Sequence, residues 1–221
     1  MRDIYHDEMD EVGQTLVDMA RLVASGMERA TRALLDADLA SAEQVISDDA
    51  MIDRMRSVVE ESTFRLVAQQ QPVATDLRVL MSGLRLVSDL ERMGDLALHV
   101  AKVARMRFPE VAVPPELRDI ITQMGQVALS LVNKVADVID GRDIALAHEI
   151  EVEDDSMDAL HRKLFTLLLS PHWNYGVEAA IDMTLLGRYY ERYADHAVAV
   201  ARRVIYIVTG KMPEPIQSLP L

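Results

Sequence analysis

The sequence predicts an all-α protein of six helices, arranged as two tandem three-helix bundles related by a pseudo-two-fold axis. Of its 221 residues, 50% are hydrophobic, while only 9 are glycine and 5% are aromatic. This composition favours helices over strands. Apolar residues also recur every three or four positions along the chain. In addition, the chain resembles itself after a shift of about 100 residues, the mark of a repeat.

Prolines and turn residues divide the chain into the segments that we expect to be helices. These segments are 4–37, 39–70, 73–108, 115–141, 143–169 and 175–210. The breaks fall at Pro72, in the proline-containing stretch 109–115 and in 170–176. We expect the sequence FPEVAVPP (108–115) to be the hinge between the two halves.

The first segment shows the helical pattern most clearly, because its apolar residues form one stripe. The stripe consists of Leu16, Met19, Ala20, Val23, Met27, Ala30 and Leu34. Most methionines, including Met51 and Met55 of the second segment, sit at similar spacing and are interpreted as core packing.

A shift of 105 residues aligns the first two segments of one half with those of the other, so that Asp38 falls on Asp143. Both aspartates follow a short turn and are predicted to be helix N-caps. A shift of 100 aligns LERMGDLALHVAK (90–102) with YERYADHAVAVAR (190–202). The five-residue difference is absorbed near residue 170.

The repeat predicts two domains, 1–109 and 114–221. The formal net charge of -13 disfavours direct binding to nucleic acid. The absence of cysteine excludes thiol catalysis and fits a reducing compartment. The charged start MRDIYHDEMD does not resemble a signal peptide, and no apolar run approaches the roughly 18 residues of a membrane span. We therefore expect a cytoplasmic protein that reaches a membrane only through partners.

Four pairs of acidic residues, each spaced i, i+4 on one helix face, occupy equivalent places in the two halves. They are Asp49 with Asp53, Glu91 with Asp95, Asp154 with Asp158, and Glu191 with Asp195. Such pairs are common in an acidic chain, and most of them are solvated faces with local cationic partners. Their position along the chain is more informative than their number.

Pro72 lies midway between Asp53 and Glu91, so an antiparallel hairpin that turns there brings these two residues level. The same turn brings Asp49 level with Asp95. In the second half the turn near 174–175 pairs Asp158 with Glu191 and Asp154 with Asp195 in the same way. Each half is therefore predicted to hold four carboxylates at one level of a hairpin.

Clustered carboxylates repel one another and need compensation. Protonation, an arginine network or a bound cation could supply it, and oxygen ligands suit Mg, Ca, Mn, Fe or Zn. His99 lies four residues after Asp95 and is a candidate extra ligand, the alternative being an ordinary surface or interhelix histidine. His196 points away from Asp195 and is interpreted as a packing or hydrogen-bonding residue.

No glycine-rich phosphate loop, nucleophile elbow or Ser/His/Asp arrangement stands out in the sequence. We therefore expect no enzymatic activity and no catalytic residues. A carboxylate cluster that holds metal-activated water would be a hydrolase, which is the minor alternative.

Three stretches carry a resemblance to a known family. They are PVATDLRVLMSGLRLVSDLERMGDLALHVA (72–101), ERYADHAVAVA (191–201) and VIYIVTGKM (204–212). The chain resembles the PhoU phosphate-uptake regulators along nearly its whole length. The resemblance implies two three-helix bundles whose acidic E/D-x-x-x-D motifs can hold clusters of iron or other metals. Carried over by position, these motifs are the four acidic pairs named above.

The sequence departs from the usual family pattern at three positions: Ala194 replaces the glycine of the second motif, and His99 and Ala199 stand where asparagine is common. The resemblance implies repression of the phosphate-starvation response through contacts with the ATPase of a phosphate ABC transporter and with a sensor histidine kinase. A homodimer is also expected. The alternative is a bundle that binds or buffers metal.

Overall fold

The computed structural model describes residues 2–213, and within this range the chain forms long helices and no strand. The elements are α1 (Arg2–Asp36), α2 (Leu39–Gln70), α3 (Ala74–Arg107), the 3-10 helix η1 (Pro115–Leu117), α4 (Arg118–Gly141), α5 (Ile144–Leu168) and α6 (Gly176–Thr209). The predicted all-α class is confirmed. The largest difference from the predicted boundaries is at the fourth helix, which was expected to begin at residue 115. Pro115–Leu117 form a separate 3-10 turn, and α4 begins at Arg118. Residues 1 and 214–221, at the outer edges of the two predicted domains, lie outside the described range.

Both predicted N-caps are present and explain where α2 and α5 begin. The Asp38 carboxylate accepts a hydrogen bond from the backbone N–H of Ser41 at 3.1 Å. The Asp143 carboxylate accepts one from Ala145 at 2.8 Å and one from Leu146 at 3.1 Å. Such a cap contributes about 1 kcal/mol to helix stability. The two halves of the chain therefore start their second helices by the same device.

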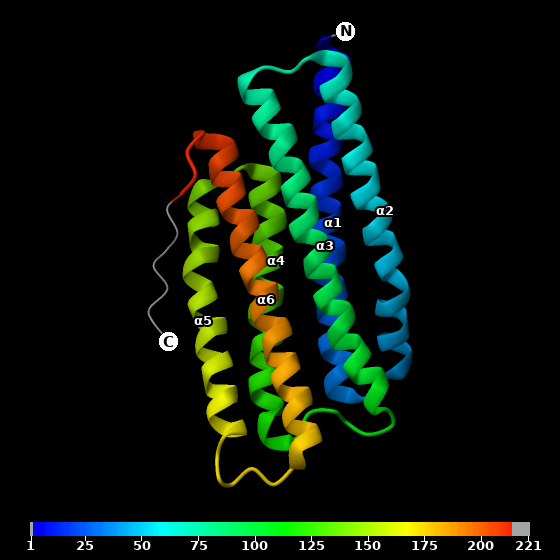
Figure 1. Ribbon diagram of the computed structural model, residues 1–221, viewed down its shortest axis with the longest axis vertical. Helices are drawn as coiled ribbons and strands as arrows, with labels where there is room; N and C mark the ends of the chain where they lie inside the picture. Colours follow the sequence, from blue (N-terminus) through cyan, green and yellow to red (C-terminus); the bar gives the residue numbers. More distant parts are fainter. Residues whose placement is uncertain (1, 214–221) are drawn as a thin grey trace.

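The helices form two side-by-side units of three, α1–α3 and α4–α6 (Figure 1). In each unit every helix contacts the other two, while α1 packs on α4 and α3 packs on α6 to join the units. The outer helices, α2 and α5, lie at opposite edges of the molecule (Figure 1). The hairpin turn of the first unit and that of the second lie at opposite ends (Figure 1), as they do when the pseudo-two-fold axis is perpendicular to the helices.

One apolar core runs through both units. The whole stripe that the sequence predicts for the first helix is buried, including Met19 and Met27, which have no exposed surface. Met55 is half-buried. The interpretation of Met51 as a core residue was wrong, because its side chain is 46% exposed. None of the described helices combines the length and the hydropathy that a membrane crossing needs.

Polar contacts add to the apolar packing between the units. The hydroxyls of Thr31 on α1 and Tyr190 on α6 share a hydrogen bond of 2.7 Å inside the core. Arg107, the last residue of α3, donates to the buried carboxylate of Asp182 on α6 at 2.6 Å. A buried polar group without a partner would cost about 1–3 kcal/mol, so these pairs favour one relative placement of the units.

Candidate functional site

The first acidic cluster consists of Asp49 and Asp53 on α2 with Glu91 and Asp95 on α3. Burial raises the pKa of Asp49, and the charges of Asp95, Asp53 and Glu91 raise it further. The four carboxylates are therefore close enough to act on one another, as the distances from the Pro72 turn predict.

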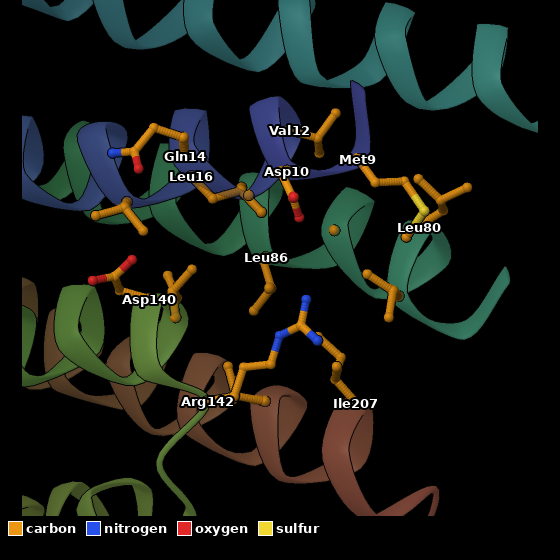
Figure 2. Close-up of a pocket in the computed structure, with 16 residues that line it drawn as sticks. Met9, Asp10, Val12, Gln14, Leu16, Leu80, Leu86, Asp140, Arg142 and Ile207 are labelled. Carbon is orange, nitrogen blue, oxygen red and sulfur yellow. The ribbon is translucent and has the colours of Figure 1, made fainter. Parts of the chain in front are cut away.

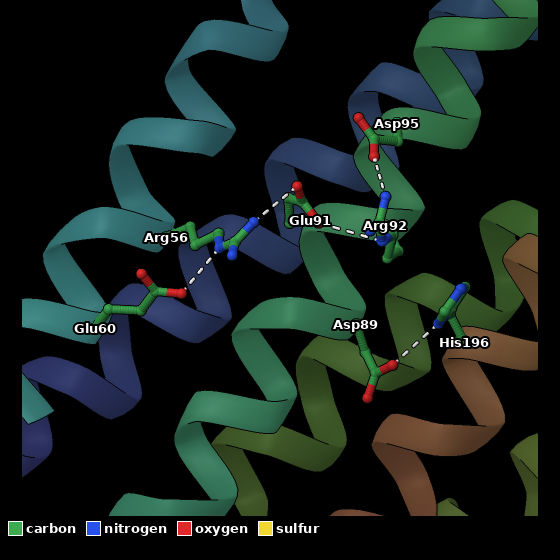
Figure 3. Close-up of polar contacts among 7 residues, drawn as sticks. All are labelled: Arg56, Glu60, Asp89, Glu91, Arg92, Asp95 and His196. Carbon is green, nitrogen blue, oxygen red and sulfur yellow. Dashed lines mark hydrogen bonds and ion pairs between the residues drawn. The ribbon is translucent and has the colours of Figure 1, made fainter.

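Two arginines compensate the first acidic cluster (Figure 3). Arg56 on α2 donates across the hairpin to Glu91 on α3 at 3.0 Å, and also to Glu60 on its own helix at 2.9 Å. Arg92 donates to Asp95 at 3.1 Å. The pair between Arg56 and Glu91 joins the two helices, so it holds the hairpin together at the level of the acids.

The second acidic cluster consists of Asp154 and Asp158 on α5 with Glu191 and Asp195 on α6. Burial, followed by the charges of Asp158 and Asp195, raises the pKa of Asp154 to about 7. The pKa values of Glu191 and Asp195 are also raised, in both cases mainly by burial. Asp154 is therefore the carboxylate of this cluster that keeps a proton up to the highest pH.

The cations near the second cluster pair within single helices. Arg188 pairs with Glu191 on α6, and Arg162 lies 3.9 Å from Asp158 on α5. His161 of α5 is part-buried, and its Nε2 atom has no hydrogen-bond partner. Burial and the nearby Arg188 lower the pKa of His161. No described cation crosses this hairpin in the way that Arg56 crosses the first.

The donor atoms of both clusters suit a hard or intermediate cation, because they are carboxylate oxygens. The Oε2 atoms of Glu91 and Glu191 are buried and accept no hydrogen bond, so each could serve as a ligand atom. However, within residues 2–213 no three His, Asp or Glu side chains lie close enough together to hold a metal ion. Coordination would therefore require the acids to turn away from their arginine partners. Metal binding stays a prediction.

The two histidines beside the acidic motifs face the other unit. His99 is exposed, and its ring stacks on Tyr189 of α6 with ring centroids 5.2 Å apart. Its role as an extra metal ligand stays a prediction. His196 shares a hydrogen bond of 3.0 Å with Asp89 of α3 (Figure 3). The interpretation of His196 as a hydrogen-bonding residue is confirmed.

A cavity of about 260 Å³, which was not predicted from the sequence, lies between the units (Figure 2), and none of the eight cluster carboxylates lines it. Its walls come from α1, α3, α6 and the end of α4, and are mostly apolar. Asp10, Asp140 and Arg142 supply charge at its edge. Gly13 and Gly83, which add no side chain to fill the space, are the sequence signal that could have indicated it.

Two segments of the chain, residues 16–104 and 121–204, match the family model described as PhoU domain. The two starts differ by 105 residues and the two ends by 100, the same shifts that align the sequence with itself. The match therefore covers most of each three-helix unit. The domain limits 1–109 and 114–221 stay a prediction.

Several proteins are similar along nearly the whole chain. The phosphate-specific transport system accessory protein PhoU homolog 2 of Mycobacterium tuberculosis is 51% identical over 213 residues, covering 96% of this chain and 100% of that protein. The homolog 1 protein of Mycobacterium leprae is 50% identical over 214 residues, covering 97% and 96%.

Solved structures agree with the sequence relatives. The crystal structure of PhoU from Pseudomonas aeruginosa superposes with a TM-score of 0.85 at 30% identity, covering 94% of this chain and 100% of that one. The phosphate transport system regulatory protein PhoU from Streptococcus pneumoniae gives 0.83 at 26% identity, covering 96% and 100%. This chain belongs to the PhoU family.

Proposed function

We propose that this protein is an accessory regulator of phosphate uptake, which represses the phosphate-starvation response when phosphate is plentiful. The observation that carries the proposal is the likeness over 96% of the chain to proteins named phosphate-specific transport system accessory proteins. It acts by binding partners in the cytoplasm and not by catalysis. Those partners are the ATPase of a phosphate ABC transporter and a sensor histidine kinase.

The test is deletion of the gene, followed by measurement of phosphate-regulated transcription in phosphate-rich medium. Because Mycobacterium tuberculosis has two such proteins, named homolog 1 and homolog 2, any second homologue must be deleted as well. We expect transcription to be high in the deleted strain and repressed again when the gene is restored. Unchanged repression after removal of every homologue would contradict the proposal.

Repeated apolar rows on the surface support the partner contacts. On α6, Val177 and Ile181 are 76% and 54% exposed. The equivalent residues of α3, Leu77 and Met81, are also exposed. Since exposed apolar rows of this kind mark interaction surfaces, the protein offers two similar faces for its partners or for a second copy of itself.

Two measurements test these faces. Pull-down of the transporter ATPase and of the kinase with Ile181→Glu and with Met81→Glu would show which face each partner uses. Light scattering of the purified protein would test the expected homodimer, with the same variants expected to give a monomer. If both variants bind and assemble like the parent, the rows are not the interface.

We also propose that the acidic clusters bind a divalent cation as part of this regulatory role. A bound cation would neutralise the carboxylates and join α5 to α6, or α2 to α3. The buried Oε2 atoms of Glu91 and Glu191, which accept no hydrogen bond, favour cation binding. Metal analysis of the purified protein, repeated on Glu91→Ala/Asp95→Ala and Glu191→Ala/Asp195→Ala, is expected to show metal lost with the acids. Metal content that does not depend on these residues would contradict it.

The same clusters favour a second candidate function, a metal-buffering bundle. Such a protein would bind and exchange metal readily while phosphate-regulated transcription ignored its deletion. A metal-dependent hydrolase would instead show phosphatase turnover that disappears in the acid variants. The transcription measurement and a turnover assay therefore distinguish the three hypotheses: regulator, metal buffer and hydrolase.

A further inference from the structure

Arginines gather on the outer face where α3 packs against α6, in a protein whose net charge is -13. Arg85 comes from α3, and Arg203 and Tyr206 come from α6. The Arg203 guanidinium lies over the Tyr206 ring, 5.8 Å from its centroid. A third guanidinium, that of Arg78 on α3, lies 6.0 Å from the same centroid. Two helices from different units thus bring cations around one aromatic ring.

Arg85 and Arg203 differ from most interhelix arginines of this protein, which pair with carboxylates. Arg107, for example, binds Asp182. Among residues 2–213, neither Arg85 nor Arg203 forms an ion pair. The charge of Asp89 acts on Arg203, but that carboxylate is already hydrogen-bonded to His196. The two guanidiniums therefore lack an anionic partner of their own.

The Nε atom of Arg203 is buried and donates no hydrogen bond within the described part of the chain. Burial lowers the pKa of Arg203, and the nearby positive charge of Arg85 lowers it further. The contacts of Asp89 with His196 and of Arg78 with Ile207 fix the register of α3 against α6 and place Arg85 within one helical turn of the level of Arg203. By contrast, Arg78 is anchored, because its Nε donates to the backbone oxygen of Ile207 at 3.1 Å. Two like charges side by side are unfavourable, and an anion that binds both guanidiniums would relieve their repulsion.

We propose that Arg85 and Arg203 form a binding site for a phosphate group, with Tyr206 as one wall of the site. A phosphate carries up to two negative charges and several acceptor oxygens, so it can accept hydrogen bonds from two guanidiniums at once. A carboxylate matches a single arginine fork and would leave one cation unpaired. The phosphate can be free inorganic phosphate or the phosphate of a nucleotide.

The phosphate site consists only of residues of the α3–α6 face, and its existence does not depend on the proposed function. The site is separate from both acidic clusters, whose cations are Arg56, Arg92, Arg162 and Arg188. Failure of phosphate binding here would leave the regulatory proposal standing, and the reverse also holds.

The experiment titrates inorganic phosphate and, separately, ATP into the full chain in metal-free buffer at constant ionic strength. Calorimetry gives the dissociation constant of every variant, and the side-chain Nε–H resonance of Arg203 in ¹H–¹⁵N spectra, which the parent and Arg85→Gln both retain, reports that binding is at the site. We expect a saturable shift, and a dissociation constant about tenfold larger in Arg85→Gln and in Arg203→Gln, since each loses a charged hydrogen bond. Arg21→Gln is the matched control, because Arg21 is an exposed arginine of α1.

Saturation with inorganic phosphate identifies free phosphate as the source, and saturation with ATP alone identifies a nucleotide. The proposal is overturned if neither ligand saturates, if Arg85→Gln binds like the parent, or if acetate binds as tightly as phosphate. Because Arg85 is exposed, its variant keeps the test decisive even if Arg203→Gln fails to fold.

Discussion

The two acidic clusters have the same four carboxylates at the same levels of their hairpins, but their cations differ. In the first unit Arg56 reaches from α2 to Glu91 of α3. The shift of 105 residues places His161 at the equivalent position of the second unit, and its buried Nε2 has no partner. The second hairpin therefore lacks the cross-helix ion pair of the first.

A second cation also differs between the clusters. In the first cluster, the positive charge of Lys102 opposes the rise in the pKa of Asp49 that burial causes. Its equivalent in the second unit, Arg202, instead binds the buried carboxylate of Glu151 at 2.6 Å. The first unit has Ile46 where Glu151 stands. The two units therefore have the same acidic residues but different cationic residues beside them. We infer that the two clusters differ in their affinity for protons and for cations.

The largest expected effect is on the pH dependence of stability. Because the folded-state pKa of Asp154 is about 7, well above the ordinary aspartate value, its contribution to stability is present at low pH and is lost as pH rises through 7. At pH 8 with chelator present, Asp154→Asn should therefore be more stable than the parent by on the order of 1–3 kcal/mol. Chemical denaturation at pH 4 to 8 measures the difference, which should vanish near pH 4.

The matched control is Asp49→Asn at the level of the first cluster. The pKa of Asp49 is also raised, but Lys102 opposes the shift. We therefore expect a smaller gain at pH 8 than for Asp154→Asn. Equal gains would mean that the counter-charges do not distinguish the clusters.

The second prediction removes the ion pair that crosses the first hairpin. Arg56→Gln should lower the free energy of unfolding at pH 7 by about 1–2 kcal/mol, because Glu91 loses its cross-helix partner, while part-exposure of both groups limits the effect. The pKa of Asp49 should rise at the same time. The control is His161→Gln, the equivalent change in the second unit, which removes no ion pair. A larger loss in the control would contradict this account.

Much of this comparison could be predicted from the sequence. The helices, the N-caps Asp38 and Asp143 and the level of the acids follow from local periodicity and from distances to the turns, which are properties of one hairpin at a time. Whether those acids bind metal is a different matter, since it depends on side-chain positions that spacing does not determine.

What could not be predicted depends on how the two units pack. The sequence suggests that Arg92 could pair with either Asp89 or Asp95, which lie one helical turn to each side of it. In the structure it takes Asp95, while Asp89 is hydrogen-bonded to His196 of the other unit. Met51 was misjudged because the helical period alone does not say which face of an outer helix meets a neighbour.

The third prediction concerns a substitution that gives the second cluster the arginine of the first. In His161→Arg, a guanidinium at the equivalent of Arg56 should reach Glu191 across the hairpin. The added positive charge should lower the pKa of Asp154 by about one unit. Carboxyl ¹³C chemical shifts followed over pH 4 to 9 measure that pKa. A variant that folds but keeps the pKa of Asp154 near 7 would show that a guanidinium at this position does not offset the burial and the neighbouring carboxylates that raise it.

The smallest expected effect concerns the glycine position of the two motifs, which is Gly94 in the first unit and Ala194 in the second. A Cβ on Gly94 would lie 2.7 Å from Cδ1 and 3.3 Å from Cγ2 of Ile52. Alanine itself favours the helix over glycine by roughly 0.5–1 kcal/mol. Since Ile52 is β-branched and stiff, the overlap should outweigh this gain, and Gly94→Ala should destabilise the protein by about 0.5–1 kcal/mol.

The second unit indicates how the overlap can be relieved. The residue equivalent to Ile52 is Met157, which is fully buried and unbranched. In the Gly94→Ala background, Ile52→Met should therefore restore stability, whereas Ile52→Met alone should cost a little packing. A double-mutant cycle measured by denaturation should give a coupling of about 0.5–1 kcal/mol. Additive effects would mean that the glycine of the first motif is not retained for its contact with α2, and that the two motifs differ there by chance.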